Sequence, residues 1–218
     1  MMNAVNDVLT APQSEGDQQF SKRIYTPRLL IAALKDLYRN SDEMRSAMRE
    51  GRISKAFSER IMLAVTAVNG CRYCSYAHAK MAQKSGISQD EVERLLGGDV
   101  AGATTDEAPA LFFAQHYAER DGHPDPDAWQ HLVAVYGEEV ARDVLVHIRM
   151  ITMGNLSGNS LDALLSRLRG RPAPESSLLG EIVVLGILGF GTPLLAVAIV
   201  FKRLGRALGQ QASGAQVH

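Results

Sequence analysis

Apolar residues recur every three or four positions along most of this 218-residue chain, and no segment alternates apolar and polar residues as a half-buried strand would. Hairpin signals, such as Asn-Gly between two apolar strands, are absent from the sequence. Glycines and prolines divide the periodic stretches into helices of ordinary length. The pattern predicts an all-α fold in which amphipathic helices bury their apolar faces against one another.

The composition divides the chain into three parts. Residues 1–25 are polar and small and have no period, which predicts a flexible N-terminal arm. Residues 26–170 carry the helical periodicity and are expected to form one helical bundle. Residues 171–218 are expected to form an apolar C-terminal helical segment that associates with a membrane or with other subunits.

Two boundaries inside the helical part follow from single residues. Thr26 and Pro27 favour a helix start, and apolar spacing predicts one helix from there to about Arg49. Near the end of the bundle, Gly154-Asn155 and Gly158-Asn159 are expected to interrupt the last long helix.

The C-terminal segment contains twenty consecutive uncharged residues, 182–201, and basic residues occur on both sides of them: Arg167, Arg169 and Arg171 before, and Lys202, Arg203 and Arg206 after. At 1.5 Å per helical residue this run is long enough to cross a hydrocarbon core. Gly189-Phe190-Gly191-Thr192-Pro193 interrupts it and can either kink one helix or turn a short helix back on another. Membrane association through residues 178–206 is therefore expected, with burial between subunits as the alternative.

Overall charge and the N-terminus bear on partners and location. Lys plus Arg is 23 against 24 for Asp plus Glu, so no basic field is available to gather nucleic acid. The N-terminus lacks a basic start followed by an apolar run, so no secretory signal is expected. A cytoplasmic protein follows, held at the inner face of the cell membrane if its tail binds lipid. In that compartment a close cysteine pair is more often redox-active or metal-binding than structural.

The two cysteines occur in NGCRYCSYAHAKM, which spaces Cys71, Cys74 and His78 as C-x2-C-x3-H. On a helix these three side chains share one face. Cys71 falls at the expected helix N-terminus, where free N–H groups lower the pKa of a thiol below its usual value of about 8.5. A nearby imidazole can take the proton from Cys74.

Three interpretations of this motif are open. The cysteines can form a redox dithiol, or a metal site with His78 and Glu59 as further ligands, or they can be buried core residues beside a core histidine. A c-type haem site is excluded, since Ser75 follows the second cysteine where that motif has histidine. Glu59 lies on a helix that is otherwise apolar nearly all round, which favours a proton-carrying role, with a buried ion pair as the alternative.

The pattern Glu59-x11-Cys71-x2-Cys74-x3-His78 resembles the alkylhydroperoxidase D-like (AhpD-like) core of the carboxymuconolactone decarboxylase superfamily. The resemblance covers about residues 26–170. It implies an all-helical homo-oligomer, a trimer or hexamer, that needs no organic cofactor. It further implies that Cys74 attacks the peroxide, that Cys71 resolves the sulfenic acid into a disulfide, and that His78 and Glu59 relay the proton.

One position departs from the family pattern, because Tyr73 stands where the peroxidase prototype has histidine just before the second cysteine. A phenol with a pKa of about 10 is a poor proton shuttle at neutral pH. Tyr73 and His147, which lies on the apolar stripe of its helix, are secondary candidates. The decarboxylase branch typically lacks the cysteine pair, so lactone decarboxylation is not expected.

The sequence therefore predicts a thiol-dependent oxidoreductase, a peroxidase or a disulfide reductase. Its substrate would be a hydroperoxide or another small molecule, and an external thiol or protein reductant would restore the dithiol. Membrane lipid peroxides become a substrate class if the tail binds lipid. The alternative is a membrane-tethered redox or metal sensor without turnover.

Overall fold

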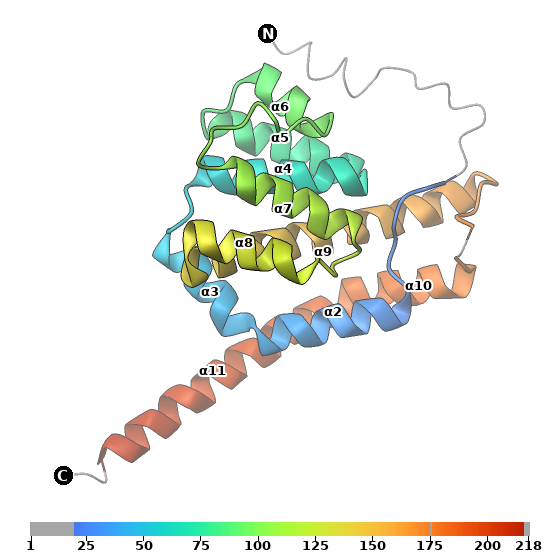
Figure 1. Ribbon diagram of the computed structural model, residues 1–218. Coiled ribbons are helices and arrows are strands. Elements are labelled where there is room, and N and C mark those ends of the chain that lie inside the picture. The colour runs from blue at the N-terminus through green and yellow to red at the C-terminus, as the bar shows by residue number, and fades with distance from the viewer. Residues whose placement is uncertain (1–19, 175, 216–218) are drawn as a thin grey trace.

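The computed structural model describes residues 20–174 and 176–215, and within these ranges every regular element is a helix, which confirms the all-α fold (Figure 1). The helices, in chain order, are α2 (Pro27–Arg39), α3 (Ser41–Glu50), α4 (Lys55–Asn69), α5 (Arg72–Lys84), α6 (Gln89–Leu96), α7 (Ala108–Glu119), α8 (Pro126–Tyr136), α9 (Glu138–Leu168), α10 (Leu178–Gly186), the π-helical turn η1 (Ile187–Gly191) and α11 (Thr192–Ala215).

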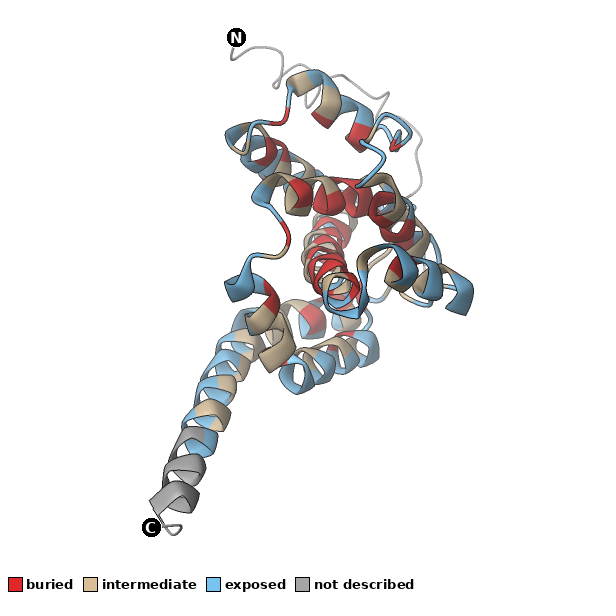
Figure 2. Cartoon of the chain, turned by 60° about the vertical axis from the view of Figure 1, so that its left-hand side comes forward, coloured by how far each residue is buried: buried red, intermediate tan, exposed pale blue. Residues whose placement is uncertain are grey.

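The core lies between α4 and α9, with α5, α6, α7 and α8 packed around them. α4 carries apolar residues around most of its circumference, so burial on several sides is its stable arrangement, and α9 buries apolar and hydrogen-bonded polar residues against it. Figure 2 shows the buried residues concentrated on these helices, while the C-terminal helix is mainly exposed or intermediate.

The glycine–asparagine pairs do not interrupt the last long helix, contrary to the prediction. α9 runs unbroken for 31 residues, from Glu138 to Leu168. Its asparagines are held by tertiary hydrogen bonds instead: the Asn159 amide donates to the Asn69 carbonyl at 2.8 Å, and the Asn155 amide oxygen accepts from Thr66 at 3.1 Å. These bonds satisfy polar groups that local propensity alone would place in a turn.

The N-terminal part of the bundle also differs from the prediction. One helix to Arg49 was expected, but the chain turns at Asn40 and forms α2 and α3. Residues 1–19 of the predicted arm lie outside the described residues. Its last residues are packed rather than loose, since Tyr25 is buried and Lys22 forms an ion pair with Asp162 at 2.9 Å.

The apolar C-terminal segment is continuous and helical, so the hairpin alternative is wrong. The described residues contain one stretch long and apolar enough to cross a membrane, the 29 residues Leu178–Arg206, and only 6% of its most apolar window is buried. The interruption before Pro193 becomes the wide turn η1. Proline lacks an N–H and clashes with the preceding turn, and a π-turn absorbs both effects without ending the helix.

Polar contacts hold the two ends of this segment against the bundle. At its start, the buried Glu181 carboxylate accepts from Arg167 Nε at 2.8 Å and from Nη2 at 3.1 Å. At its far end, Lys202 Nζ donates to the Tyr38 carbonyl at 2.9 Å, and Arg206 pairs with Asp42. The helix therefore lies alongside α2, and its basic residues cap the C-terminal end of that helix.

Candidate redox site

The cysteine motif lies where α4 ends and α5 begins. Gly70 ends α4 with φ 66°, a left-handed conformation that glycine adopts without strain. Cys71 then caps α5, with its sulfur accepting the backbone N–H of Cys74 at 3.3 Å. The asparagine–glycine stop and the cysteine cap place both thiols in the first turn of α5, as the sequence predicted.

The two sulfurs face each other. Cys71 Sγ and Cys74 Sγ lie 2.7 Å apart, and both cysteines are free thiols. Cys71 is fully buried, whereas Cys74 is partly accessible to solvent. The site thus presents one sulfur to an incoming molecule and keeps the other within reach behind it.

The surroundings of the two thiols shift their pKa values in opposite directions. The pKa of Cys71 is lowered to about 7, chiefly by the hydrogen bond from the Cys74 thiol and further by backbone N–H groups and the Lys22 charge, although burial opposes the shift. The pKa of Cys74 is raised, because its proton is hydrogen-bonded to Cys71 and because the group is buried. The pair therefore loses its first proton near neutral pH, with the charge on Cys71 and the remaining proton on Cys74.

α9 packs against this pair through two glycines on one face. A Cβ atom on Gly158 would lie 2.7 Å from Cys71 Sγ, and one on Gly154 would lie 3.9 Å from Cys74 Sγ. The two glycines are four residues apart on α9, and the two cysteines are three residues apart on α5. Each pair therefore lies on one face of its helix, about one turn apart. The stretch that the sequence predicted as a break is therefore the wall of the cysteine site.

Glu59 and His78 form a second pair. His78 Nδ1 lies 2.8 Å from Glu59 Oε2, and both side chains are largely buried. With Nδ1–H donating to the carboxylate, Nε2 is the ring nitrogen left to accept a proton. Among the described residues, no hydrogen bond joins either side chain to a cysteine sulfur, so the structure brings the four predicted residues together as two pairs.

This arrangement disfavours the metal-site alternative for Cys71, Cys74, His78 and Glu59. Within the described part of the chain, no three His, Cys, Asp or Glu side chains are gathered closely enough to hold an ion. A structural zinc site needs four ligands converging on one point.

Tyr73 has a structural partner that the sequence did not indicate. Its hydroxyl donates to Asp162 Oδ1 at 3.0 Å, and the same carboxylate pairs with Arg72 at 2.6 Å and Lys22 at 2.9 Å. Asp162 thereby connects the first turn of α5 to α9, next to Cys71. Sequence reasoning missed Asp162, Lys22 and Gly158, and the only available signal was the Gly-x3-Gly-x3-Asp spacing along one helix.

The other secondary candidate, His147, lies buried on α9. Its Nδ1 lies 2.8 Å from the backbone carbonyl of Asp143, one turn earlier on the same helix. This bond gives the buried ring a local structural partner within α9.

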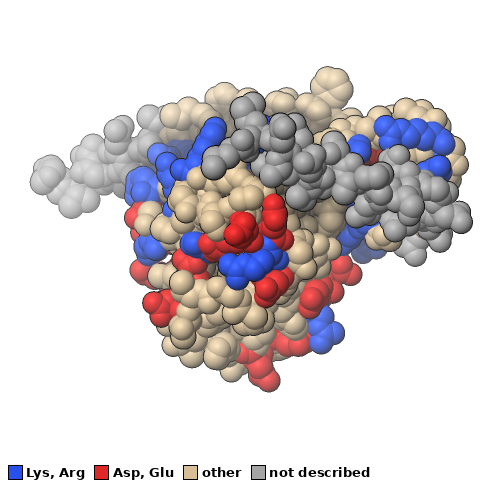
Figure 3. Space-filling view, turned by 90° about the horizontal axis from the view of Figure 1, so that it is seen from above, with Lys and Arg blue, Asp and Glu red and all other residues tan. Residues whose placement is uncertain are grey.

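The surface gathers no extended field of one charge on the face seen in Figure 3, where basic and acidic side chains lie side by side. Elsewhere in the described ion pairs, Arg60 contacts Glu91 at 2.6 Å and Glu107 at 3.3 Å. Such pairing matches the near-zero net charge of the chain.

Comparison with known proteins places this site in a family. No curated protein and no solved structure matches the chain. Residues 35–116 match the model of the carboxymuconolactone decarboxylase family, and this segment contains Glu59, Cys71, Cys74 and His78. Through this segment the chain is similar to the carboxymuconolactone decarboxylase family, the superfamily of AhpD-like proteins that its cysteine motif resembles.

Proposed function

We propose that this protein is a thiol-dependent oxidoreductase whose Cys71–Cys74 pair reduces hydroperoxides while cycling between dithiol and disulfide. The observation that carries the proposal is the pair itself: two free sulfurs 2.7 Å apart, one buried with a lowered pKa and one accessible. A family that includes decarboxylases as well as peroxidases does not decide the reaction, but a lone decarboxylation has no use for a facing dithiol.

The proposed cycle starts from the singly deprotonated pair. Transfer of the shared proton to Cys71 puts the thiolate on the accessible Cys74, which attacks the terminal peroxide oxygen. The O–O bond breaks, Cys74 becomes a sulfenic acid, and the alkoxide leaves and takes up a proton. Cys71 then attacks the oxidised sulfur, a disulfide forms and water departs. An external dithiol reduces this disulfide and is itself oxidised.

Glu59 and His78 are proposed as the source of the proton for the alkoxide. His78 follows Cys74 by one helical turn on α5, a spacing that puts the two Cβ atoms about 5–6 Å apart. The carboxylate at Nδ1 fixes the ring and leaves Nε2 to exchange a proton with the reacting groups, directly or through water.

Turnover of cumene hydroperoxide with dithiothreitol tests the proposal. The wild-type chain should consume many equivalents, and Cys74→Ser should abolish consumption. Cys71→Ser should form no intramolecular disulfide, and it should consume peroxide only as dithiothreitol reduces the Cys74 sulfenic acid directly. Glu59→Gln should slow the reaction by about 10²–10⁴-fold. Glu93→Gln, on the exposed side of α6, is the matched control and should leave the rate unchanged.

Two results would contradict the proposal. A wild-type chain that oxidises once and then stops in excess dithiothreitol is a sensor rather than an enzyme. If Cys74→Ser keeps the wild-type rate, the attacking sulfur is misassigned. If the protein does not consume peroxide but continuously reduces a small disulfide, the dithiol still cycles and the substrate is a disulfide instead of a hydroperoxide.

We also propose that the C-terminal helix attaches the enzyme to a membrane surface, lying in the plane of the interface. Its outward side exposes large apolar side chains, among them Leu179, Ile182, Phe190, Leu194 and Phe201. Its inward side packs along α2. It is held at Glu181 by α9, at Lys202 by the end of α2 and at Arg206 by α3. A helix that crossed the bilayer while keeping these contacts would carry α2 into the hydrocarbon, so a flat position accommodates both sides.

Flotation with vesicles of phosphatidylcholine and phosphatidylglycerol tests the attachment. The protein should float with the vesicles and be released by alkaline carbonate, while Phe190→Glu should remain in solution. Phe112→Glu, which changes another exposed phenylalanine but on α7, should still float. Resistance to carbonate would indicate a spanning helix, and a change of oligomer mass in Phe190→Glu without loss of flotation would indicate subunit packing. The predicted trimer or hexamer stays a prediction.

A further inference from the structure

A cavity of about 330 Å³ lies between α2 and α9, and it is separate from the cysteine site. Its lining on α9 includes Arg149, Thr152, Met153 and Leu156. These positions lie on the opposite side of α9 from Gly154 and Gly158, whose face meets the cysteines. None of the four residues of the proposed redox site lines it. The volume is at the lower end of the range for small-molecule pockets, about 300–1,000 Å³.

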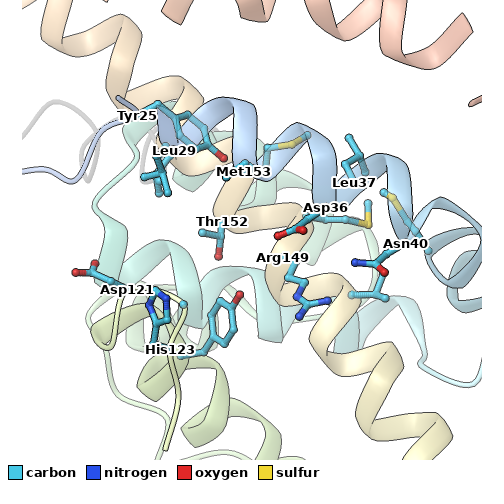
Figure 4. A pocket seen from close by; sticks show the side chains of 18 of the residues that line it. Tyr25, Leu29, Asp36, Leu37, Asn40, Asp121, His123, Arg149, Thr152 and Met153 are labelled. Carbon is cyan, nitrogen blue, oxygen red and sulfur yellow. The ribbon is translucent and has the colours of Figure 1, made fainter. Parts of the chain in front are cut away.

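The cavity is mainly apolar along its length. Leu29, Ala33 and Leu37 line it from α2, and Met153 and Leu156 line it from α9. Figure 4 shows these two helices facing each other across the space, with the side chains of Leu29, Leu37 and Met153 between them. An apolar chain is therefore the natural occupant of the middle of the cavity.

At one end, the hydroxyl of Tyr25 has no partner. The Tyr25 side chain is more than nine-tenths buried, points into the cavity in Figure 4, and makes no hydrogen bond through its hydroxyl to any described residue. Burial raises the pKa of Tyr25 to about 12, so the group stays a neutral donor at physiological pH. A hydroxyl that faces the cavity without a described partner is free to donate to an oxygen of a bound molecule.

Toward the other end, Arg149 is a cation without a partner among the described residues. Arg149 lines the cavity, is exposed to solvent, and is not within ion-pair distance of any described carboxylate. Along α9, Arg149 precedes Leu156 by seven residues, about 10 Å at 1.5 Å per residue, and Leu156 packs in one cluster with Tyr25. The apolar stretch between the two unpartnered donors, Tyr25 and Arg149, is thus about as long as a medium-length hydrocarbon chain.

We propose that this cavity binds a medium-chain monocarboxylic acid that bears an oxygen function at its far end. Arg149 holds the carboxylate, the hydrocarbon chain lies between α2 and α9, and the Tyr25 hydroxyl donates to the terminal oxygen. Asp36 and Glu43 also line the cavity and disfavour a second anionic group on the ligand. The remaining acid, Asp121, is already paired with Arg23 at 2.9 Å.

Titration calorimetry with three probes below their micelle concentrations tests the site: 10-hydroxydecanoate, decanoate and decanol. The hydroxy acid should bind most tightly and the alcohol most weakly. Tyr25→Phe should weaken 10-hydroxydecanoate by about tenfold and leave decanoate unchanged, since only the former uses the hydroxyl. Arg149→Met should weaken both acids by about tenfold and leave decanol unchanged.

Two control variants separate this site from unspecific adsorption on the apolar C-terminal helix. Tyr76→Phe and Arg28→Met change exposed residues outside the cavity and should leave all affinities as in the wild type. Equal affinity of the three probes would overturn the proposal. So would probe affinities that neither cavity variant changes, or tighter binding of decylamine than of decanoate. Peroxide turnover plays no part in these measurements, so their outcome is independent of the redox proposal.

Discussion

Replacing Gly158 by alanine places one methyl group directly against the redox pair. The new Cβ would lie 2.7 Å from Cys71 Sγ and 3.3 Å from Tyr73 Cδ2. Ordinary contacts between heavy atoms are about 3.5–4.0 Å, so the sulfur must move by about 1 Å or α5 must shift away from α9. Cys71 is the more constrained of the two thiols, since it also caps α5.

The effect on stability has two opposing parts. Overpacking a well-filled core costs about 1–3 kcal/mol. Alanine in place of a mid-helix glycine gains about 1 kcal/mol. Gly158→Ala should therefore destabilise the protein by about 0–2 kcal/mol. Gly154→Ala is the matched control on the same helix, because its Cβ would meet Cys74 Sγ at an ordinary 3.9 Å. Gly154→Ala should therefore stabilise the protein by about 1 kcal/mol, because it gains helix propensity without a steric clash.

Urea unfolding measures the stabilities, and thiolate absorbance at 240 nm measures the site. Displacing Cys71 weakens its hydrogen bond with Cys74, so Gly158→Ala should raise the pKa of the first thiol from about 7 toward the usual range. Gly154→Ala should leave it unchanged. Equal stabilities and equal titration curves for the two variants would refute the close packing of α9 on the cysteines.

Three further predictions rest on charges around the site and the tail. The reduced protein should become more stable as pH rises from about 7 toward the usual thiol pKa of about 8.5, because the folded chain has released a Cys71 proton that the unfolded chain still binds. Urea unfolding of Cys71→Ser should lack this rise. Asp162→Asn should cost about 1–3 kcal/mol in urea unfolding, since it leaves Lys22 and Arg72 without their shared anion, and no loss would contradict the anchoring role. Asp42→Asn should speed amide exchange in α11 near Arg206, because it removes the ion pair that holds this end of the helix. In the wild type, acid should loosen this contact only below the usual pH range for Asp, because the Arg206 hydrogen bond lowers the pKa of Asp42. Unchanged exchange would show that the tail is held by other contacts.

Much of the fold could be predicted from the sequence because its signals are local. Ser54 and Ser88 cap α4 and α6 through their side chains, as the spacing of capping residues indicates. The cap by Cys71 and the left-handed Gly70 follow from the same rules. Local signals placed both cysteines and His78 along one face of a helix, and they lie at the start and in the first half of α5.

The errors arose where tertiary contacts override local preference. Gly and Asn in series favour a turn, but α9 continues because Asn159 is bonded to the end of α4 and the glycines admit α5 closely. Pro193 favours a break, but a π-turn carries the helix through. Neither outcome is encoded within the segment itself.

The partners of the site residues were the least predictable part. Asp162 lies about ninety positions from Tyr73, so no sequence window contains both. The pairing of Glu59 with His78 spans nineteen positions and was available only through the family resemblance. No sequence motif indicates the cavity between α2 and α9, because it brings Tyr25 close to a helix that is distant in the sequence.

The central claim is that Cys71 and Cys74 act as one redox unit. Peptide mass spectrometry without reducing agent, after addition of one equivalent of cumene hydroperoxide to the reduced chain, tests it most directly. We expect one equivalent of peroxide to be consumed and an intramolecular Cys71–Cys74 disulfide to form, with a loss of two hydrogens, reversible by dithiothreitol. Unreacted thiols, or sulfinic and sulfonic acid on Cys74 with Cys71 still reduced, would contradict the claim.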